Sequence, residues 1–388
     1  MAIKYPEGVV KIAKILADGG YKSYAVGGCI RDALMGRIPN DWDMTTNCSP
    51  EKMLEVFDAA GIRTIPTGLK HGTVSILLDG EIYECTTFRI DGNYTDSRHP
   101  DKVTFTADIS EDLRRRDFTV NAMAGNPLSG GEIVDIFGGQ NDINARIIRA
   151  VGNPETRFTE DALRILRAVR FATVLGFDID ESTKAAAKSL GNRLESISAE
   201  RKSVELQKIL LSDNADRGIS LLLECDLAKY VHKDIISPKV LLASLPNRFY
   251  TRLAALFSCV PDLSPMKLSG EVTHKTKTLC DEALYAETVA KFEDDGAKAR
   301  YMLAKYGDIA PDAALLRGDK RLSRLILTES EKNPAVIIRD LAVNGNDLIA
   351  EGIEKRRLGD ILSSLLQSVI ENPSLNQKDI LISLSKKA

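Results

Sequence analysis

The sequence predicts an α+β protein in which strands and helices mix near the N-terminus and helices alone follow. Short apolar or alternating runs at residues 24–26, 72–78 and 81–88 are typical of strands. The Asp79-Gly80 pair between the last two runs predicts a hairpin turn. Beyond Phe177 the pattern is that of amphipathic helices.

The composition is that of an ordinary globular protein. The chain has 388 residues, enough for two or three domains, and 44% of them are hydrophobic. A net charge of -3 does not indicate a nucleic-acid-binding protein, although local basic patches matter more than the total. No apolar run approaches the ~20 residues of a membrane span, and the polar N-terminus predicts no signal peptide.

Six scattered cysteines contain no Cys-x-x-Cys pair. This pattern favours reduced thiols in a cytosolic setting over a zinc site or a disulfide framework. His232-Lys-Asp234 lacks the adjacent His-Asp pair of a histidine-aspartate metal domain, so we expect these residues at the surface.

Two helices are predicted before the hairpin. Apolar residues recur at helical spacing from Pro6 to Asp18 and stop at Gly19-Gly20. Ser49-Pro50 is a typical helix start, with serine as N-cap and proline in the first position, and this helix should run to about Ala60.

The first candidate site follows a short helix that ends near Met35. Asp41-Trp42-Asp43 should lie on a strand, so that both carboxylates face one way and Trp42 packs on the other side. Two carboxylates about 7 Å apart on one strand face can hold hard divalent cations, although such a pair is often only a solvated strand face. Glu84, on the predicted strand 81–88, is either a third carboxylate or an ordinary exposed glutamate.

Glycines and arginines near these carboxylates suggest a phosphate site. Gly27 and Gly28 would let a ligand approach the backbone, although two glycines after a strand usually form a simple turn. Arg31 follows one helical turn later and could hold phosphate oxygens.

A polar segment, Asp91 to Ala107, contains Arg98-His99-Pro100 and is long for a connection without structure of its own. Ser110 should cap a short helix that carries three arginines, which form either a solvated basic face or a phosphate site centred on Arg116. Asp117 and Asn121 would contact a ribose or fix the arginines.

Residues 160–175 predict one helix with an apolar side and a charged side. Its charged residues form either intrahelical salt bridges or a recognition surface. The charged side carries Glu160, Asp161, Arg164 and Arg167, with Arg170 just outside it.

Five motifs together resemble one family. They are Gly-Gly-x-x-Arg-Asp-x-Leu-x-Gly-Arg-x-x-x-Asp-x-Asp from Gly27, Arg-Arg-Asp-Phe-Thr-Val-Asn-Ala from Arg115, Asp-x-x-Gly-Gly from Asp135, the segment 160–171 and the segment 198–205. In this order, over roughly residues 20 to 210, they resemble the class II tRNA nucleotidyltransferase and poly(A) polymerase family.

The resemblance implies a domain scheme. It comprises a catalytic head related in fold to DNA polymerase beta (1–145), a helical neck (146–211), a helical body (212–275) and a helical tail that binds tRNA (276–388). It implies addition of C, C and A to the tRNA 3′ end from CTP and ATP without a template. The segment 91–107 would help the enzyme change from adding C to adding A.

The resemblance also implies roles for individual residues. Asp41 and Asp43 would be catalytic and hold Mg²⁺, with Glu84, Asp117 and Asn121 as further candidates. The nucleotide would be bound by Gly28, Arg31, Arg116, Asp161, Arg164, Arg167 and Arg170. Asp161 would accept from the amino group and Arg164 would donate to the ring nitrogen that cytosine and adenine share, whereas uracil and guanine reverse this pattern.

Two alternatives stay open at this stage. One is an enzyme that adds only A, or a poly(A) polymerase. The other is a non-enzymatic tRNA-binding module, which the presence of Asp41, Asp43, Asp161 and Arg164 disfavours. We expect a cytoplasmic protein without membrane attachment, as a monomer or a homodimer.

Overall fold

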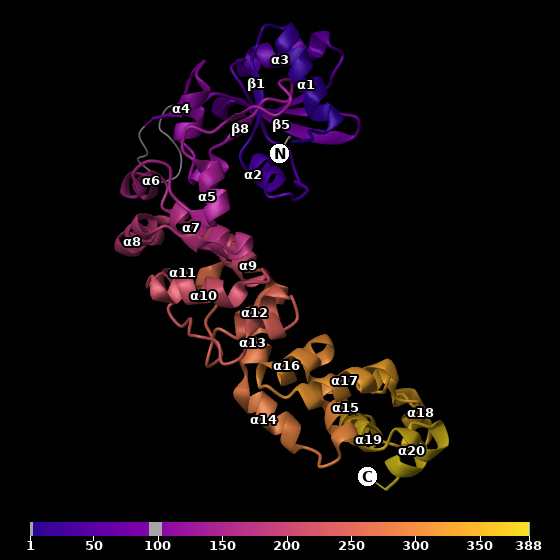
Figure 1. Cartoon of the computed structure of the whole chain (residues 1–388). Coiled ribbons are helices and arrows are strands. Elements are labelled where there is room, and N and C mark those ends of the chain that lie inside the picture. The colour runs from indigo at the N-terminus through magenta and orange to yellow at the C-terminus, as the bar shows by residue number, and fades with distance from the viewer. Residues whose placement is uncertain (1–2, 93–102, 388) are drawn as a thin grey trace. The chain divides into compact units, whose positions relative to one another are not determined.

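The computed structural model describes residues 3–92 and 103–387. The chain divides into two compact units, residues 1–233 and 234–388. The first unit holds a mixed sheet and continues into helices, and the second unit is helical (Figure 1). The predicted α+β class is therefore confirmed. The four-part division at residues 145, 211 and 275 is not tested by the two units and stays a prediction.

The described part of the chain forms a seven-stranded sheet in the order β3-β4-β5-β2-β1-β8-β9. All neighbours are antiparallel except β2 and β5, which are parallel. Its strands are β1 (Ser23–Val26), β2 (Met44–Thr46), β3 (Thr64–Gly68), β4 (Thr73–Leu78), β5 (Glu81–Thr87), β8 (Ala124–Gly125) and β9 (Ile133–Val134). Two strand pairs lie outside it, β6 (Arg89–Asp91) with β7 (Val103–Phe105) and β10 (Ile147–Ile148) with β11 (Asp178–Ile179).

The helices of the first unit begin before the sheet and continue beyond it. They are α1 (Glu7–Asp18), α2 (Gly28–Leu34), α3 (Pro50–Ala59), α4 (Ile109–Arg114), α5 (Gly139–Ala145), α6 (Pro154–Glu160), α7 (Leu163–Leu175), α8 (Glu181–Ser189), α9 (Ala199–Leu210), α10 (Ala215–Glu224) and α11 (Ala228–Val231).

Helices α1 and α3 pack against the sheet. Ile12 and Leu16 of α1 and Phe57 of α3 are buried in one apolar cluster with Ile76 of β4. The N-terminus of α3 is the predicted one, because the Ser49 side chain accepts a hydrogen bond from the Lys52 backbone and proline occupies the first position.

The predicted hairpin is also confirmed. β4 and β5 pair in register from Thr73 opposite Thr86 to Leu78 opposite Glu81. Asp79 (φ 52°) and Gly80 (φ 87°) both adopt the left-handed conformation that a two-residue hairpin turn requires.

The second unit has its own core. A buried ion pair between Arg300 and Glu329 (2.9 Å) links two of its helices, and Arg300 also donates to the carbonyls of Ile370 and Glu371 at the end of a third. Its helices are α12 (Phe249–Ala254), α13 (Gly270–Cys280), α14 (Glu282–Ala290), α15 (Asp295–Tyr306), α16 (Ala310–Leu316), α17 (Lys320–Glu331), α18 (Gly345–Ala350), α19 (Leu358–Glu371) and α20 (Lys378–Ser385).

Two predictions about backbone around the candidate site were wrong. Asp41 to Asp43 precede β2, which begins at Met44. The Asp43 carbonyl still accepts a hydrogen bond from Val26 of β1, so the chain is already aligned with the sheet there.

The helix predicted for 160–175 is two helices, because Asp161 is extended (φ -136°, ψ 104°) and ends α6. A capping aspartate competes with helix continuation through its own side chain.

The segment 91–107 is partly a strand. β7 pairs with β6 at its end, and residues 93–102, including Arg98-His99-Pro100, lie outside the described residues. Asp108, rather than the predicted Ser110, caps α4, because its side chain accepts from the Ser110 backbone.

Three smaller details concern the helical part. Among the amphipathic helices expected beyond Phe177, α10 ends just before Asp226, whose positive φ of 58° separates it from α11. The motif segment 198–205 forms the start of α9, which Ser198 precedes without a capping side-chain hydrogen bond. His232, expected at the surface, is buried.

Candidate functional site

Three carboxylates gather where β2 and β5 run parallel. Met44 pairs with Cys85, so the residues that precede them, Asp43 and Glu84, are neighbours. Burial, followed by repulsion from Asp41 and Glu84, raises the pKa of Asp43 to about 6, and Arg116 partly opposes this rise. Like charges held this close are stabilised by a bound cation.

The carboxylates suit a divalent cation but do not form a complete ligand set. Among the described residues, no group of three or more His, Cys, Asp or Glu side chains is arranged to hold a metal ion. Mg²⁺ often takes only one or two protein carboxylates and completes its shell with water and phosphate oxygens. The Asp41–Asp43 pair therefore fits such an ion, and the part of Glu84 stays a prediction.

Trp42, between the two aspartates, lies in the packing as predicted. Its ring meets that of Tyr5 edge to face with their centroids 5.5 Å apart, and it packs against the core of the sheet. This contact anchors the segment that carries the aspartates.

Arg116 lies against the glycine turn that follows β1. Gly27 has φ 82°, and a Cβ atom there would be 2.9 Å from Nη1 of Arg116. Any other residue at position 27 would therefore be strained and would displace Arg116. Asp112 ion-pairs with both Arg115 and Arg116; although burial opposes its charge, the two arginines hold the pKa of Asp112 below its ordinary value.

Arg31 is one end of a network of hydrogen bonds that reaches Arg167. It ion-pairs with the adjacent Asp32 (2.8 Å) and donates from Nη1 to Oδ1 of Asn121 (2.6 Å). Asn121 donates to Asp117, which also accepts two hydrogen bonds from Arg167 of α7. Of the two roles left open for Asp117 and Asn121, the structure shows contacts to arginines.

Asp117 is ionised within this chain. Although burial disfavours its charge, Arg167, Arg164 and Asn121 lower the pKa of Asp117 to about 2. This network of hydrogen bonds thus joins α2, which follows the glycine turn, to α7 through charged and amide groups.

Asp161 and Arg164 lie on either side of the start of α7. Asp161 accepts from the Leu163 backbone (3.0 Å) with one oxygen and pairs with Arg201 of α9 (3.1 Å) through the other. Arg164 is buried and pairs with Glu160 (2.7 Å). It also donates to the Arg115 carbonyl, directly before Arg116.

Two residues predicted to bind the nucleotide remain, Gly28 and Arg170. Gly28 is the first residue of α2, and Arg170 of α7 pairs with buried Glu205 of α9. Every predicted site residue therefore lies in the first unit, but in two groups, one around Asp43 and Arg116 and one around α7.

Several contributors were not predicted. Asp32, Asp112, Arg201 and Glu205 each hold an arginine or aspartate of the predicted site. The spacing of Arg201 and Glu205, one turn apart on a helix, was a usable signal for the last two.

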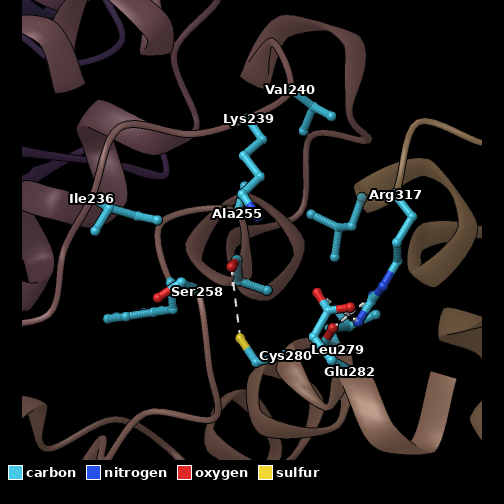
Figure 2. A pocket seen from close by; sticks show the side chains of 12 residues that line it. Ile236, Lys239, Val240, Ala255, Ser258, Leu279, Cys280, Glu282 and Arg317 are labelled. Carbon is cyan, nitrogen blue, oxygen red and sulfur yellow. Dashed lines mark hydrogen bonds and ion pairs between the residues drawn. The ribbon is translucent and has the colours of Figure 1, made fainter. Parts of the chain in front are cut away.

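A separate pocket in the second unit is too small for a nucleotide. Cys280, Arg317 and Glu282 line it together with apolar side chains, and Arg317 turns back to the Leu279 carbonyl and Glu282 (Figure 2). Its cavity of about 50 Å³ has room for water-sized molecules only.

The described residues contain no helix long and apolar enough to cross a membrane. All six cysteines are free thiols.

Comparison with known proteins agrees with this arrangement. Residues 23–149 match the poly A polymerase head domain, and residues 176–237 match a second family model described as a probable RNA and SrmB- binding site of polymerase A. These two matches are typical of a nucleotidyltransferase that acts on RNA ends.

Relatives over the full length narrow the class. A CCA-adding enzyme of Leuconostoc citreum is 35% identical over 97% of this chain and 94% of its own length. One of Levilactobacillus brevis is 36% identical over 96% of this chain and 95% of its own length. The crystal structure of a Bacillus stearothermophilus CCA-adding enzyme in complex with CTP, 31% identical, superposes with a TM-score of 0.79 over 98% of this chain and 96% of that one. The chain belongs to the CCA-adding enzyme family.

Proposed function

We propose that this chain adds C, C and A to the 3′ end of tRNA from CTP and ATP, without a template, and releases pyrophosphate. One observation carries the proposal: Arg116 lies against Gly27, next to the strand residue Val26 that pairs with Asp43, in a chain that matches CCA-adding enzymes over nearly its whole length. The solved relative at 31% identity was crystallised with CTP.

The reaction joins the 3′ oxygen of the tRNA to the α-phosphorus of the incoming nucleotide. The bond from that phosphorus to the bridging oxygen breaks, pyrophosphate leaves, and the hydroxyl proton passes to solvent. Asp41 and Asp43 would hold Mg²⁺, which when bound lowers the pKa of the hydroxyl and neutralises charge on the phosphates. Nucleotidyltransferases of this family generally use divalent metal ions, and we propose Mg²⁺ as the ion in this chain.

Arginines of this chain would hold the triphosphate. Arg116 lies against Gly27, which directly follows Val26, the residue whose backbone N–H donates to the Asp43 carbonyl. Its partner Asp112 fixes its direction, and Gly27 leaves it room. Arg31 would supply a second guanidinium, oriented by Asp32 and Asn121.

Asp161 and Arg164 would select the base. A carboxylate only accepts and a guanidinium only donates hydrogen bonds, which suits the shared edge of cytosine and adenine. Arg164 has five N–H donors, and its contacts to Glu160, Arg115 and Arg157 account for three of them. At least one N–H group of Arg164 can therefore donate to the ring nitrogen of cytosine or adenine.

We keep the four-part domain scheme as part of the proposal, with residues 276–388 binding tRNA. The exposed basic segment Lys355–Arg357 supports this role. We also propose a cytoplasmic location, because tRNA, CTP and ATP are substrates of that compartment and six free thiols suit a reducing one.

The test is incubation of the purified protein with tRNA that lacks its 3′ end, with CTP alone, ATP alone and both together. We expect two cytidines with CTP alone and a complete CCA end with both. Incorporation from ATP alone and none from CTP would instead indicate an enzyme that adds only A. Absence of all incorporation by folded protein would contradict the proposal.

A further inference from the structure

Three arginines assigned to the nucleotide meet on one aromatic ring. Phe171 of α7 is 7% exposed, and the guanidinium carbon of Arg170 lies 3.8 Å from its ring centroid. Those of Arg167 and Arg31 lie at 5.3 Å and 5.4 Å. All three distances are within the roughly 6 Å over which a cation is attracted to a ring face.

The three guanidinium groups come from two separate elements. Arg167 and Arg170 lie on α7, and Arg31 lies on α2 after the glycine turn. The rings of Phe171 and Phe118 meet edge to face, with their centroids 5.7 Å apart and an interplanar angle of 74°, and this contact fixes the orientation of Phe171. Phe171 is therefore a fixed surface between the glycine turn and the start of the helical region.

Each arginine has one carboxylate of its own. Arg31 pairs with Asp32, Arg167 with Asp117 and Arg170 with Glu205. Three cations close together repel one another, and each carboxylate offsets part of this repulsion. The negative face of the aromatic ring adds an attraction that all three guanidinium groups share.

We propose that Phe171 is a positioning residue that holds Arg31, Arg167 and Arg170 for the triphosphate. Stacking engages the flat face of a guanidinium and leaves its in-plane N–H groups to hydrogen-bond phosphate oxygens. The inference rests on the proposed nucleotide site but does not require a particular RNA substrate. Its effect falls on the triphosphate, which CTP, ATP and UTP share.

A leucine at position 171 would keep most of the buried apolar volume but lose the ring face. Phe171→Leu is therefore the test variant, and Phe171→Tyr is the conservative variant that restores the ring face. Phe177→Leu is the matched control, because Phe177 is 4% exposed, follows the same helix and has no guanidinium over its ring among the described contacts. The full chain is used, with Mg²⁺ present.

The assay is isothermal titration of CTP and of ATP, without tRNA, together with the melting temperature of each variant. We expect Phe171→Leu to weaken both nucleotides by about tenfold, Phe171→Tyr to regain most of this loss, and Phe177→Leu to lower the melting temperature without weakening binding. Equal weakening by Phe171→Leu and Phe177→Leu, or none by either, would overturn the proposal.

A second measurement needs no variant. The guanidinium carbon of Arg170 lies 3.8 Å from the ring centroid of Phe171, so the neighbouring side-chain protons of Arg170 should be shifted upfield by the ring current in the NMR spectrum of the wild-type protein. Absence of that shift would also overturn the proposal. Failure of CCA addition with nucleotide binding intact would contradict the proposed function and leave this inference standing.

Discussion

Replacing Asp161 by alanine should weaken the choice of CTP over UTP. If Asp161 accepts a hydrogen bond from the base amino group, its removal deletes that bond and the repulsion of the uracil carbonyl. A charge-assisted hydrogen bond contributes roughly 1.5–3 kcal/mol, so discrimination should fall by about one to two decades. The same loss should appear for ATP against GTP, because one pair of side chains reads both accepted bases.

Asp161 has structural contacts besides its proposed contact to the base, and alanine removes these as well. Asp161 also accepts from the Leu163 backbone and pairs with Arg201, so alanine removes that hydrogen bond, worth about 1 kcal/mol, as well. Asp161→Asn keeps an oxygen for the Leu163 backbone but offers an N–H donor that suits uracil. A fall in discrimination in both variants would therefore reflect base reading and not the lost backbone contact.

The measurement is the ratio of kcat/KM for CTP to that for UTP, with the melting temperature recorded for each variant. Arg170→Ala is the control, since Arg170 stacks on Phe171 and pairs with Glu205, and we expect slower addition with an unchanged ratio. If the ratio stays constant in both Asp161 variants while the rate collapses, Asp161 is structural and our account of base selection is wrong.

Three further predictions concern Asp43, Asp117 and Lys355. Asp43→Ala should abolish both C and A addition with little change in melting temperature, and more than a few per cent of residual activity would contradict the metal assignment. Asp117, with a folded pKa of about 2 against an ordinary 3.8, stabilises the fold above pH ~4 and loses this contribution as pH falls toward 2. Asp117→Asn should therefore lower the free energy of unfolding by about 2 kcal/mol at pH 7 but much less near pH 2, as urea titrations would show. Lys355→Gln should reduce the slope of log tRNA affinity against log salt by about one if Lys355 contacts a phosphate, and an unchanged slope would exclude that contact.

Periodicity and turn chemistry predicted much of the head. The hairpin at Asp79-Gly80 and the start of α3 at Ser49 were confirmed because each depends on local chemistry alone, a positive φ in one case and a capping oxygen in the other. The helix 160–175 was wrong for a related reason. Its apolar residues, such as Ile165 and Val169, are buried as expected, but periodicity does not report the competing cap at Asp161.

Candidate site residues were predictable from motifs, whereas their partners were not. Glu205 holds Arg170 across a helix pair, and the two residues are separated by more than thirty positions in the sequence. Pairings of this kind depend on how α7 packs against α9, which no local pattern specifies. The burial of Arg164 shows the same limit, since its carboxylate and carbonyl partners come from α6 and from the end of α4.

The two groups of site residues are physically joined, and this has a consequence for substrate choice. Arg164 donates to the Arg115 carbonyl, next to Arg116, while Arg31 reaches Arg167 through Asn121 and Asp117. A base that does not hydrogen-bond to Asp161 and Arg164 leaves these buried polar groups unpaired, which raises the free energy of the complex. Because these side chains are connected to the arginines of the phosphate site, the mismatch should also disturb those arginines. A wrong nucleotide would then bind its triphosphate less well, as well as its base. Discrimination against UTP should accordingly appear in KM as well as in kcat, because the contacts that read the base also hold the residues that grip the phosphates.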